Sequence, residues 1–485
     1  MPSQRCQRAA GRPSAPTSPP RRAQPRGRSQ RPSPRQDEPK AVRRVDRSPA
    51  PAASPRPGYD HRPGGAVPRR LRSSLVVLLV VVVAVAMALL VAGRFFGTGP
   101  TFDEVVAFAQ RGDLRAFPVP GSQATGIAGQ AAPPVVPPAT DQPPRNVILV
   151  VADGMGLGEL SAASALIRGP AGGLAVESAP VVGLVRTWAG DALVTDSAAA
   201  ASAMATGLKT PDGAVSTQAD GSTPRTLFEA AAAAGMATGF VTTSGLADAT
   251  PAAFLAHAAS RDEYRTILEQ LLSSDATVLI GGDWQRYPNA LLQPDYLELV
   301  RNAESVAGAR FTVVRDAAAV ATAPAPLLAL LPARPGSRSA HGPPLAESTR
   351  RALTLLGDPA AGFLLVVEHE ETDEAAHDND VDGVVAAMLE LDEALRVILE
   401  YAAGRGDTLV VVAADHDTAG MAAAHGDFDD GIAELRWLND GHLATWVPLF
   451  AFGPGAPRFA GVLDNTEIGR RLAELRGLEG LPPAS

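Results

Sequence analysis

Three apolar segments of this sequence carry potential metal ligands where they end. The first, NVILVVAD, ends in Asp153; the second, FLLVVEH, passes through Glu368; the third, TLVVVAADH, ends in Asp415 and His416. One acidic residue after a strand is commonly an ordinary loop or capping residue, but the same pattern after three strands is a stronger signal. Carboxylates and imidazoles are ligands of Zn²⁺, and carboxylates are ligands of Mg²⁺. We therefore expect a metal-binding group where these strands end.

A helical spacing joins two further ligand types in the stretch ETDEAAHDND. Asp373 and His377 are four residues apart, so on a helix they lie on the same face, one turn apart. That spacing suits a carboxylate and an imidazole that share one metal ion, and it equally suits an ion pair on a helix surface. His442, in NDGHLATW, is expected in a loop before the last strand, and by itself it has the features of an ordinary surface histidine.

The stretch VTDSAAAASAMATGLKT places an acidic residue and a serine in front of a run of alanines. Asp196 and Ser197 are residue types favoured at helix N-termini, alanine is the best helix former, and Gly207 is a typical helix end. A helix start is enough to explain these residues. A serine at this position also lies where free backbone N–H groups and the helix dipole favour a bound phosphate, so a nucleophilic role stays open.

The elements that must hold these residues alternate between short apolar strands and longer helical patterns. We expect strands at 146–153, 236–243, 277–282, 362–369, 407–416 and, as the last one, 447–455, and helices at 226–235 and 381–404. Because the strands show no polar alternation, they indicate an α/β fold with a largely parallel central sheet and helices on both faces. Ligands of such sheets bind beyond the carboxyl ends of the strands, where the candidate metal ligands lie.

The chain divides by composition into two parts of opposite charge. Residues 1–72 are rich in Pro, Arg, Ser and Gly and hold 18 Lys and Arg against 4 Asp and Glu, whereas the remaining 413 residues hold 25 against 48. With almost no large apolar residues, the first part cannot offset its chain entropy by burial and is expected to be disordered. Its charge suits anionic lipid headgroups or nucleic acid, or only a solubilising tail that sets membrane orientation; we expect no nucleic-acid partner.

The stretch 75–93, LVVLLVVVVAVAMALLVAG, carries no charge and as a helix is long enough to cross the hydrocarbon core of a bilayer. More arginines precede it than follow it, which predicts a cytoplasmic N-terminus and a body outside the cytoplasm. A cleavable signal peptide is the alternative, but the apolar run is long and about 70 residues precede it. We predict an uncleaved single-pass anchor of the cell membrane at 73–94, a linker at 95–143 and a catalytic domain at 144–485. Cys6, the sole cysteine, leaves that domain without a disulfide.

Together these motifs resemble the alkaline phosphatases of the metal-dependent, serine-nucleophile type. Four blocks occur in order: VADGMG, VTDSAAAASAMATGLKT, DATPAAFLAHAASR, and the pair VEHEETDEAAH and VVAADH, closed by the late GH. The likeness covers most of residues 146–456, and the Asp-Ser block with the metal-ligand spacings is highly specific. It implies an enzyme that hydrolyses small phosphomonoesters through a phosphoserine, with two zinc ions and one magnesium ion. Relatives are commonly homodimers, so a homodimer is a further expectation.

The resemblance implies a role for each matching residue. The implied catalytic residues are Ser197 as nucleophile, Arg261 as the clamp on phosphate and Asp196 as the residue that orients Arg261. One zinc ion is implied at Asp373, His377 and His442, and the second at Asp153, Asp415 and His416. Magnesium is implied at Asp153, Thr250 and Glu368, with Asp248 nearby.

One position departs from the family's pattern. Relatives often carry Lys or His directly after the aspartate that is Asp373 here, where this chain has Glu374. The added negative charge is expected to weaken phosphate binding, to speed product release and to raise KM. The short stretch between His416 and His442 leaves little room for an inserted subdomain, which indicates an open pocket and a broad range of monoesters.

Two other functions remain as alternatives. A phosphodiesterase of the same superfamily would turn over a bis-ester faster than a monoester, whereas a sulfatase is disfavoured because TDSAAAASA lacks the C/S-x-P-x-R context. A catalytically weak protein that sequesters metal or phosphate is the alternative from another class, and Glu374 is the feature that favours it. Among the other histidines, His369 lies next to Glu368 and is a candidate neighbour of the site, whereas His257, His341 and His425 are expected to be structural.

Overall fold

The computed structural model describes residues 115–118, 131–169, 171–282, 292–335, 337, 340–427 and 432–485. The predicted tail (1–72) and membrane anchor (73–94) lie outside these residues, so both stay predictions. Across the described part of the chain, no helix combines the length and the apolar character that spanning a bilayer requires.

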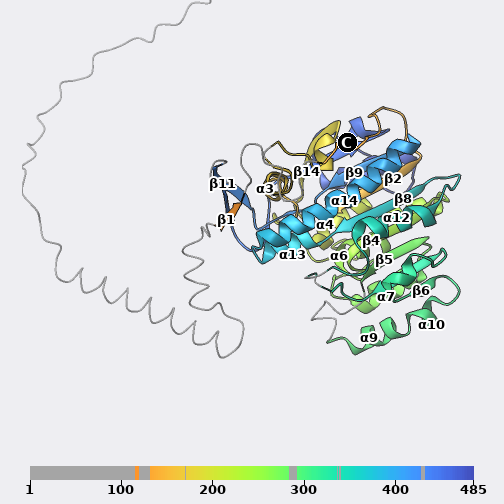
Figure 1. The fold of residues 1–485 in the computed structure, drawn as a ribbon. Helices are drawn as coiled ribbons and strands as arrows, with labels where there is room; N and C mark the ends of the chain where they lie inside the picture. The colour runs from red at the N-terminus through yellow and green to blue at the C-terminus, as the bar shows by residue number, and fades with distance from the viewer. Residues whose placement is uncertain are drawn as a thin grey trace, which may run out of the picture. The chain divides into compact units, whose positions relative to one another are not determined.

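A ten-stranded sheet runs through the described body (Figure 1). Its strands follow one another in the spatial order β15, β3, β14, β9, β2, β8, β4, β5, β7, β6. In chain order they are β2 (Asn146–Ala152), β3 (Val181–Arg186), β4 (Ala237–Gly245), β5 (Val278–Gly282), β6 (Thr312–Val314), β7 (Leu327–Leu331), β8 (Phe363–His369), β9 (Thr408–Ala413), β14 (Val447–Phe452) and β15 (Gly461–Asp464). Within this sheet only β14 runs antiparallel to its neighbours, so the predicted, largely parallel α/β sheet is confirmed.

The last strand of the sheet differs from the prediction. The segment 447–455 was expected to hold the final strand, but β15 follows β14 in the chain and pairs with β3 at the sheet edge. β15 has only four residues, and Gly461 and Val462 are exposed. The prediction is wrong here because a short, half-exposed edge strand lacks the long apolar run that marks the central strands.

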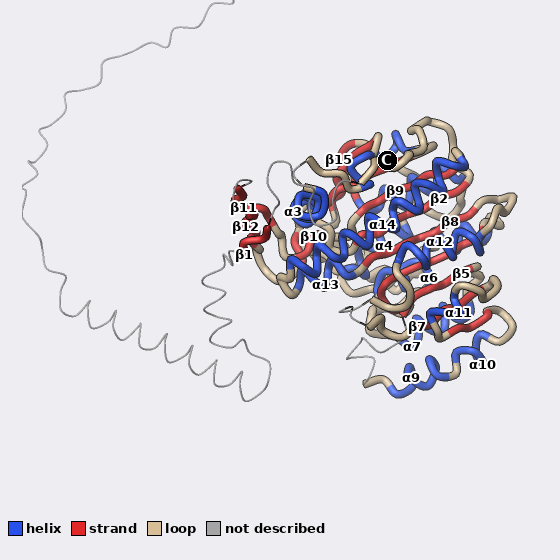
Figure 2. Tube along the Cα trace, in the orientation of Figure 1, coloured by secondary structure: helices blue, strands red, loops and turns tan. Residues whose placement is uncertain are grey.

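Helices cover the sheet because its central strands must be buried on both faces. Every residue of β2 and β8 is buried, which requires a layer on each side. The helices are α3 (Leu157–Arg168), α4 (Ser197–Thr206), α5 (Leu227–Ala233), α6 (Ala249–Leu255), α7 (Tyr264–Ser273), α9 (Pro294–Arg301), α10 (Ala303–Ala307), α11 (Ala317–Val320), α12 (Leu345–Leu356), α13 (Glu371–His377), α14 (Val381–Arg405) and α15 (Asn465–Arg476). α12 and α14 pack on each other and lie across the sheet in Figures 1 and 2, whereas α4, α6 and α15 pack with α5, which contacts β4 and β8.

Four strands between β9 and β14 in the chain, together with β1 (Arg115–Pro118), form two small sheets. β10 (Asp417–Thr418) pairs with β13 (His442–Leu443), so His442 lies in a short strand rather than in the expected loop. β11 (Ala422–Asp427) pairs with β12 (Ile432–Arg436), and β12 also pairs with β1. β1 comes from the segment predicted as a linker. These short pairings bring His442 back beside the strand that follows His416.

Candidate active site

Four potential ligands meet at the carboxyl ends of three neighbouring parallel strands. β2 lies between β9 and β8, and Val151 is in register with Glu368 on β8 and with Ala413 on β9. Asp153 follows β2 directly, and Asp415 and His416 follow β9 after one residue. Parallel register therefore places these side chains at one edge of the sheet, as the sequence predicts. We call Asp153, Glu368, Asp415 and His416 the inner group.

The inner group is fully buried and closely spaced. His416 is 0% exposed, and its Nε2 lies 3.2 Å from Asp415 Oδ2 and 3.6 Å from Asp153 Oδ1. One metal ion could be held by Asp153, His416 and Asp373, because their ligand atoms lie within 4.8 Å of one another. The resemblance names Asp415 rather than Asp373 as the third ligand of this ion, and Asp415 lies closer to His416 than Asp373 does, at 3.2 Å against 3.9 Å.

One carboxyl oxygen of each acid in the inner group lacks a hydrogen-bond partner. Asp153 Oδ1, Glu368 Oε2 and Asp415 Oδ2 are buried and accept no hydrogen bond. Burial, together with the neighbouring carboxylates Asp415 and Asp373, raises the pKa of Asp153 well above its usual value. Burial also raises the pKa of Glu368 to about 8 and that of Asp415 to about 6. Buried, unpaired and mutually repelling carboxylates are what a cation site requires, so these residues fit the metal ions that the resemblance implies.

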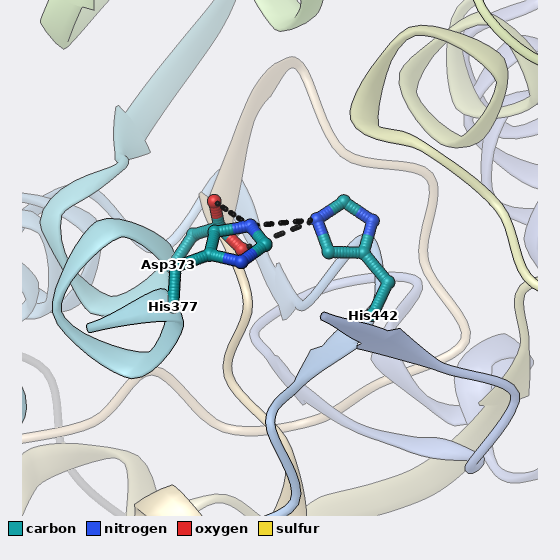
Figure 3. A group of neighbouring side chains, drawn as sticks. All are labelled: Asp373, His377 and His442. Atoms are coloured by element: carbon teal, nitrogen blue, oxygen red, sulfur yellow. Dashed lines mark hydrogen bonds and ion pairs between the residues drawn. The ribbon is translucent and has the colours of Figure 1, made fainter. Parts of the chain in front are cut away.

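Asp373, His377 and His442 form a second cluster, which we call the outer group. Figure 3 shows the two histidines pointing toward each other and toward Asp373. His377 Nε2 lies 3.3 Å from Asp373 Oδ2 and 3.2 Å from His442 Nε2, and His442 Nε2 lies 3.5 Å from Asp373 Oδ1. The predicted spacing of Asp373 and His377 on one helical turn is realised in α13, and their ligand atoms lie close enough to those of His442 to share one metal ion.

Charge is balanced within the outer group. The hydrogen bond with Asp373 raises the pKa of His377 to about 9. Burial alone would lower the pKa of His442, but Asp373 outweighs burial and raises it. Burial alone would raise the pKa of Asp373, but its hydrogen bonds with His377 and His442 hold it well below the usual value. Without a metal ion, protons on the imidazoles therefore offset the carboxylate.

Backbone and hydroxyl groups fix the orientation of all three imidazoles. His377 Nδ1–H donates to the carbonyl of Asp440 at 2.6 Å, and His442 Nδ1–H donates to the carbonyl of Thr195 at 2.9 Å. His416 Nδ1–H donates to Thr418 Oγ1 at 3.1 Å, and that hydroxyl in turn donates to Asp373 Oδ1. Each ring thus keeps Nε2 for a metal ion.

Ser197 is the first residue of α4 and lies against the inner group. Its Oγ is 3.2 Å from His416 Nε2. Asp196 caps the helix, because its side chain accepts a hydrogen bond from the Ala199 N–H at 2.9 Å. The helix ends at Gly207, whose φ of 72° is the left-handed conformation typical of helix ends. This stretch therefore both caps a helix and places Ser197 next to the candidate metal ligands.

Arg261 reaches the same place from the loop before α7, between two carboxylates. Its Nη1 lies 3.2 Å from Asp196 Oδ2 and its Nη2 lies 3.1 Å from Asp248 Oδ1. Burial alone would lower the pKa of Arg261, but Asp248 and Asp196 raise it, so the guanidinium stays charged. Burial alone would raise the pKa of Asp248, but Arg261 and Ser244 lower it to about 2. Two fixed carboxylates therefore orient a permanent cation beside Ser197.

A cavity of about 180 Å³ joins these elements. Its lining residues are Asp153, Ser197, Asp248, Ala249, Thr250, Arg261, Glu370, Asp373, Glu374, His377 and His442. Most of the predicted catalytic and metal-binding residues thus share one pocket, whereas Asp196, Glu368, Asp415 and His416 are not among its lining residues. Thr250, predicted as a magnesium ligand, lies on α6 beside Glu368.

Sequence reasoning missed two residues of this site. Glu370 lines the cavity and hydrogen-bonds with Asp248, and it is 7% exposed. Its position two residues after Glu368 is the period of a strand, which was the available signal. Thr418, which connects His416 to Asp373, follows His416 by the same interval. Neither residue type by itself signals a role in a metal centre.

The remaining histidines lie elsewhere. His369 is fully buried near Glu371 and Glu390, its Nε2 4.0 Å from Glu390 Oε2, and it does not line the cavity. His257 contacts the Ser216 carbonyl and Glu229, and His341 Nδ1 lies 3.3 Å from the carbonyl of Thr243. His425 lies exposed in β11. None of these four lines the cavity.

Comparison with known proteins agrees with this geometry. The family model for alkaline phosphatase matches residues 144–297 and 329–432. Streptomycin-6-phosphate phosphatase of Streptomyces griseus is 33% identical over an alignment of 400 positions, which covers 67% of this chain and 89% of that protein. The alkaline phosphatase of Escherichia coli (strain K12) is 30% identical over an alignment of 446 positions, which covers 76% of this chain and 93% of that protein.

Solved structures show the same likeness. The alkaline phosphatase from the Antarctic bacterium TAB5 is 27% identical, with a TM-score of 0.60 that covers 70% of this chain and all of that one. A His 135 Asp mutant of that enzyme was solved with Mg bound in its M3 site, with the same TM-score. The extent of these matches and the cation-requiring pocket lead to one conclusion: this chain belongs to the alkaline phosphatase family and is a metal-dependent phosphatase.

Proposed function

We propose that this protein hydrolyses phosphate monoesters to an alcohol and inorganic phosphate through a covalent phosphoserine on Ser197. One observation carries the proposal: Ser197 Oγ lies at a helix N-terminus, 3.2 Å from His416, in the cavity that also holds Arg261. A nucleophile, a buried ligand cluster and a phosphate-binding cation thus meet around a volume that suits a phosphoryl group.

Two zinc ions and one magnesium ion complete the proposed site. The residues that would hold them are Asp373, His377 and His442; Asp153, Asp415 and His416; and Asp153, Thr250 and Glu368, respectively. When bound, such ions lower the pKa of a coordinated hydroxyl or water and neutralise the charge that develops on the attacking and leaving oxygens.

The chain's own residues bind and orient the ester. Arg261 can offer two parallel N–H groups to two phosphate oxygens, a geometry that a lysine cannot reproduce. Asp196 and Asp248 hold this guanidinium in place before substrate arrives, so little entropy is lost when the ester binds. The N–H groups at the start of α4 face the same oxygens as Ser197. Ser197 Oγ then forms a bond to phosphorus as the alcohol oxygen leaves, and water releases phosphate from the serine in a second step.

A Ser197→Ala variant tests this proposal. With the full chain loaded with zinc and magnesium, we expect kcat for p-nitrophenyl phosphate to fall by about a thousandfold or more, because the nucleophile is removed. Acid quenching during turnover should show a phosphorylated wild-type protein and no phosphorylated variant. Ser161→Ala, at an exposed serine of α3, is the matched control and should keep both properties. Equal rates for wild type and Ser197→Ala would refute the mechanism.

Substrate and location complete the proposal. Because one relative is named a streptomycin-6-phosphate phosphatase, that ester belongs among the monoesters to be assayed.

We also propose that residues 73–94 anchor the chain in the cell membrane with the catalytic domain outside the cytoplasm, supported by the uncharged run and its arginine flank. Protease digestion of intact cells should then remove the catalytic domain; full protection would refute this orientation. A homodimer remains an expectation, which sedimentation of the detergent-solubilised chain tests.

A further inference from the structure

We propose that Asp212 is a positioning residue of the phosphate-binding site, which holds Asp196 and, through Asp196, the guanidinium of Arg261. The inference rests on the proposed monoester hydrolysis and deepens it, because it gives a role to a turn whose residues do not line the cavity. It depends on the contact of Asp212 with Asp196, on the neighbouring Gly213, and on how the turn itself is held.

Asp212 contacts the start of the nucleophile helix from the turn that follows α4. It is exposed, and its Oδ1 accepts a hydrogen bond from the backbone N–H of Asp196 at 2.9 Å. Asp196 is the N-cap of α4, with extended backbone, and an N–H at a helix start has no partner within the helix. Asp212 therefore supplies a partner that α4 lacks, and it fixes the backbone from which the Asp196 side chain extends.

Gly213, the next residue, joins Asp196 to Arg261 directly. Its N–H donates to Asp196 Oδ1 at 3.0 Å, and its carbonyl accepts a hydrogen bond from the backbone N–H of Arg261 at 2.8 Å. The φ of Gly213 is 75°, in the left-handed region that glycine adopts without strain. The turn thus holds both partners of the Arg261–Asp196 ion pair through hydrogen bonds of its own.

These contacts divide the two carboxyl oxygens of Asp196 between two tasks. Oδ1 accepts from the Ala199 N–H at 2.9 Å and from the Gly213 N–H at 3.0 Å. Oδ2 lies 3.2 Å from Arg261 Nη1. Two backbone donors therefore orient the carboxylate so that its other oxygen meets the guanidinium. A guanidinium held by fixed partners loses little entropy when it binds phosphate.

The turn is held on its other side by the loop 189–192. Asp191 Oδ1 accepts a hydrogen bond from the backbone N–H of Asp212 at 2.9 Å, and the Gly190 N–H donates to the carbonyl of Thr210 at 2.7 Å. A continuous series of contacts thus leads from Asp191 through Asp212 and Asp196 to Arg261.

Asp212 contributes a hydrogen-bond acceptor rather than a charge. Partial burial and the nearby carboxylate of Asp196 raise the pKa of Asp212, so a negative charge is disfavoured at this position. An amide oxygen can accept from the same N–H without carrying a charge. Asparagine should therefore replace Asp212, whereas alanine, which has no acceptor, should not.

Inorganic phosphate and p-nitrophenyl phosphate test the inference on the metal-loaded full chain. We expect Asp212→Ala to raise Ki for phosphate and KM for the ester by about tenfold, because Arg261 loses part of its fixed geometry. The fall in kcat should be smaller, and the content of zinc and magnesium should not change. Asp212→Asn should stay within about twofold of wild type, and Asp191→Ala should show a smaller loss than Asp212→Ala. Asp220→Ala is the matched control, because Asp220 is also an exposed aspartate that accepts a backbone N–H, at 2.9 Å from Ser222, and it should keep the wild-type constants.

An Arg261→Ala background separates positioning from a general effect on stability. If Asp212 acts through Arg261, Asp212→Ala should change Ki for phosphate by less than about twofold in that background. A turn that only stabilises the fold would weaken phosphate binding by the same factor in both backgrounds, and this result would overturn the inference. A fall in kcat with Ki for phosphate unchanged would also overturn it, because the effect would then act on Ser197 rather than on Arg261.

The outcomes distinguish the inference from the function beneath it. If wild type hydrolyses the ester and Asp212→Ala binds phosphate as wild type does, the inference fails and monoester hydrolysis stands. If wild type with complete metal content does not hydrolyse the ester, the proposed function fails. Calorimetric titration with phosphate then still tests the role of Asp212.

Discussion

The inner and outer groups use the same residue types and differ in how their charge is compensated. In the inner group, one buried oxygen of each carboxyl group accepts no hydrogen bond, and burial raises the pKa of Asp153 well above its usual value. Burial likewise lowers the pKa of His416 well below its usual value, so this ring stays neutral and does not offset the carboxylates. In the outer group, Asp373 and two partly exposed histidines compensate one another.

The difference follows from the elements that supply the ligands. The ends of the central strands are buried, and a charge placed there needs a partner that the surrounding protein atoms do not supply. α13 and the short strand β13 lie nearer to solvent, where imidazoles can take up protons. The inner group therefore depends on a cation for its stability, whereas the outer group must release protons before it can bind one.

The largest expected effect comes from Asp153→Asn. Because metal ions supply several kcal/mol of transition-state stabilisation, loss of this shared ligand should lower kcat/KM by about a thousandfold. When a chelator has removed the metal ions, the same substitution should stabilise the folded state. A carboxyl group whose pKa is raised by folding destabilises the folded state more and more as pH rises above the ordinary pKa of that group. The metal-free variant should therefore be more stable than metal-free wild type at pH 9, and the difference should be small at pH 5. Thermal unfolding with and without chelator measures both; lower stability of the metal-free variant at pH 9 would contradict the comparison.

Thr418→Val should produce the next largest effect. The Thr418 hydroxyl accepts from His416 and donates to Asp373, so it joins the two groups. Loss of such an orienting contact typically costs about 10- to 100-fold in metal affinity or activity. Metal titration and kcat/KM of the purified variant measure it, with Thr354→Val, at an exposed threonine of α12, as the control. Metal affinity equal to wild type at both groups would show that Thr418 has no orienting role.

Metal binding at the outer group should weaken as pH falls below about 9, because protons on its imidazoles compete with the metal ion. The hydrogen bond with Asp373 raises the pKa of His377 to about 9. Between pH 9 and pH 8 a proton on His377 competes with the metal ion, which weakens binding there by up to about tenfold. Competition with a chelator at each pH measures this, and His377→Gln should remove the dependence. A pH-independent outer affinity would contradict the assigned compensation.

The smallest expected effect is the stability of metal-free Asp373→Asn. A histidine whose pKa is raised by folding stabilises the folded state fully below its unfolded value of about 6.5, and this stabilisation is lost as pH rises through about 9. Because the His377 side chain is 36% exposed, solvent screening limits the loss in the variant to about 1 kcal/mol at pH 6, with less at pH 10. Chemical unfolding in chelator measures it. This variant should therefore lose stability, most of it at low pH, whereas Asp153→Asn gains stability, most of it at high pH; the same sign for both variants would remove the distinction between the groups.

Sequence patterns predicted the candidate ligands and the central strands that carry them more completely than the residues that link these ligands and the strand at the sheet edge. Apolar runs that end in Asp153, Glu368 and Asp415 predicted strands and a common edge, and the four-residue spacing of Asp373 and His377 predicted a shared helix face. Glu370 and Thr418 were missed because their one local signal, a position two residues after a candidate ligand, is shared by many residues that have no role in a site. β15 was missed because an edge strand of four residues carries too weak a signal.

The sequence by itself determined which residues are candidates for the chemistry and which long strands and helices hold most of them, because side-chain periodicity and capping preferences act over a few residues. Only the tertiary structure decided that Ser197 contacts His416, that Arg261 lies between Asp196 and Asp248, and that Glu374 shares their cavity. The tertiary structure also decided which candidate ligands are fully buried and which imidazoles can take up a proton. Distances between distant elements and the burial that shifts a pKa arise from packing of the whole chain, and no short stretch of sequence encodes them.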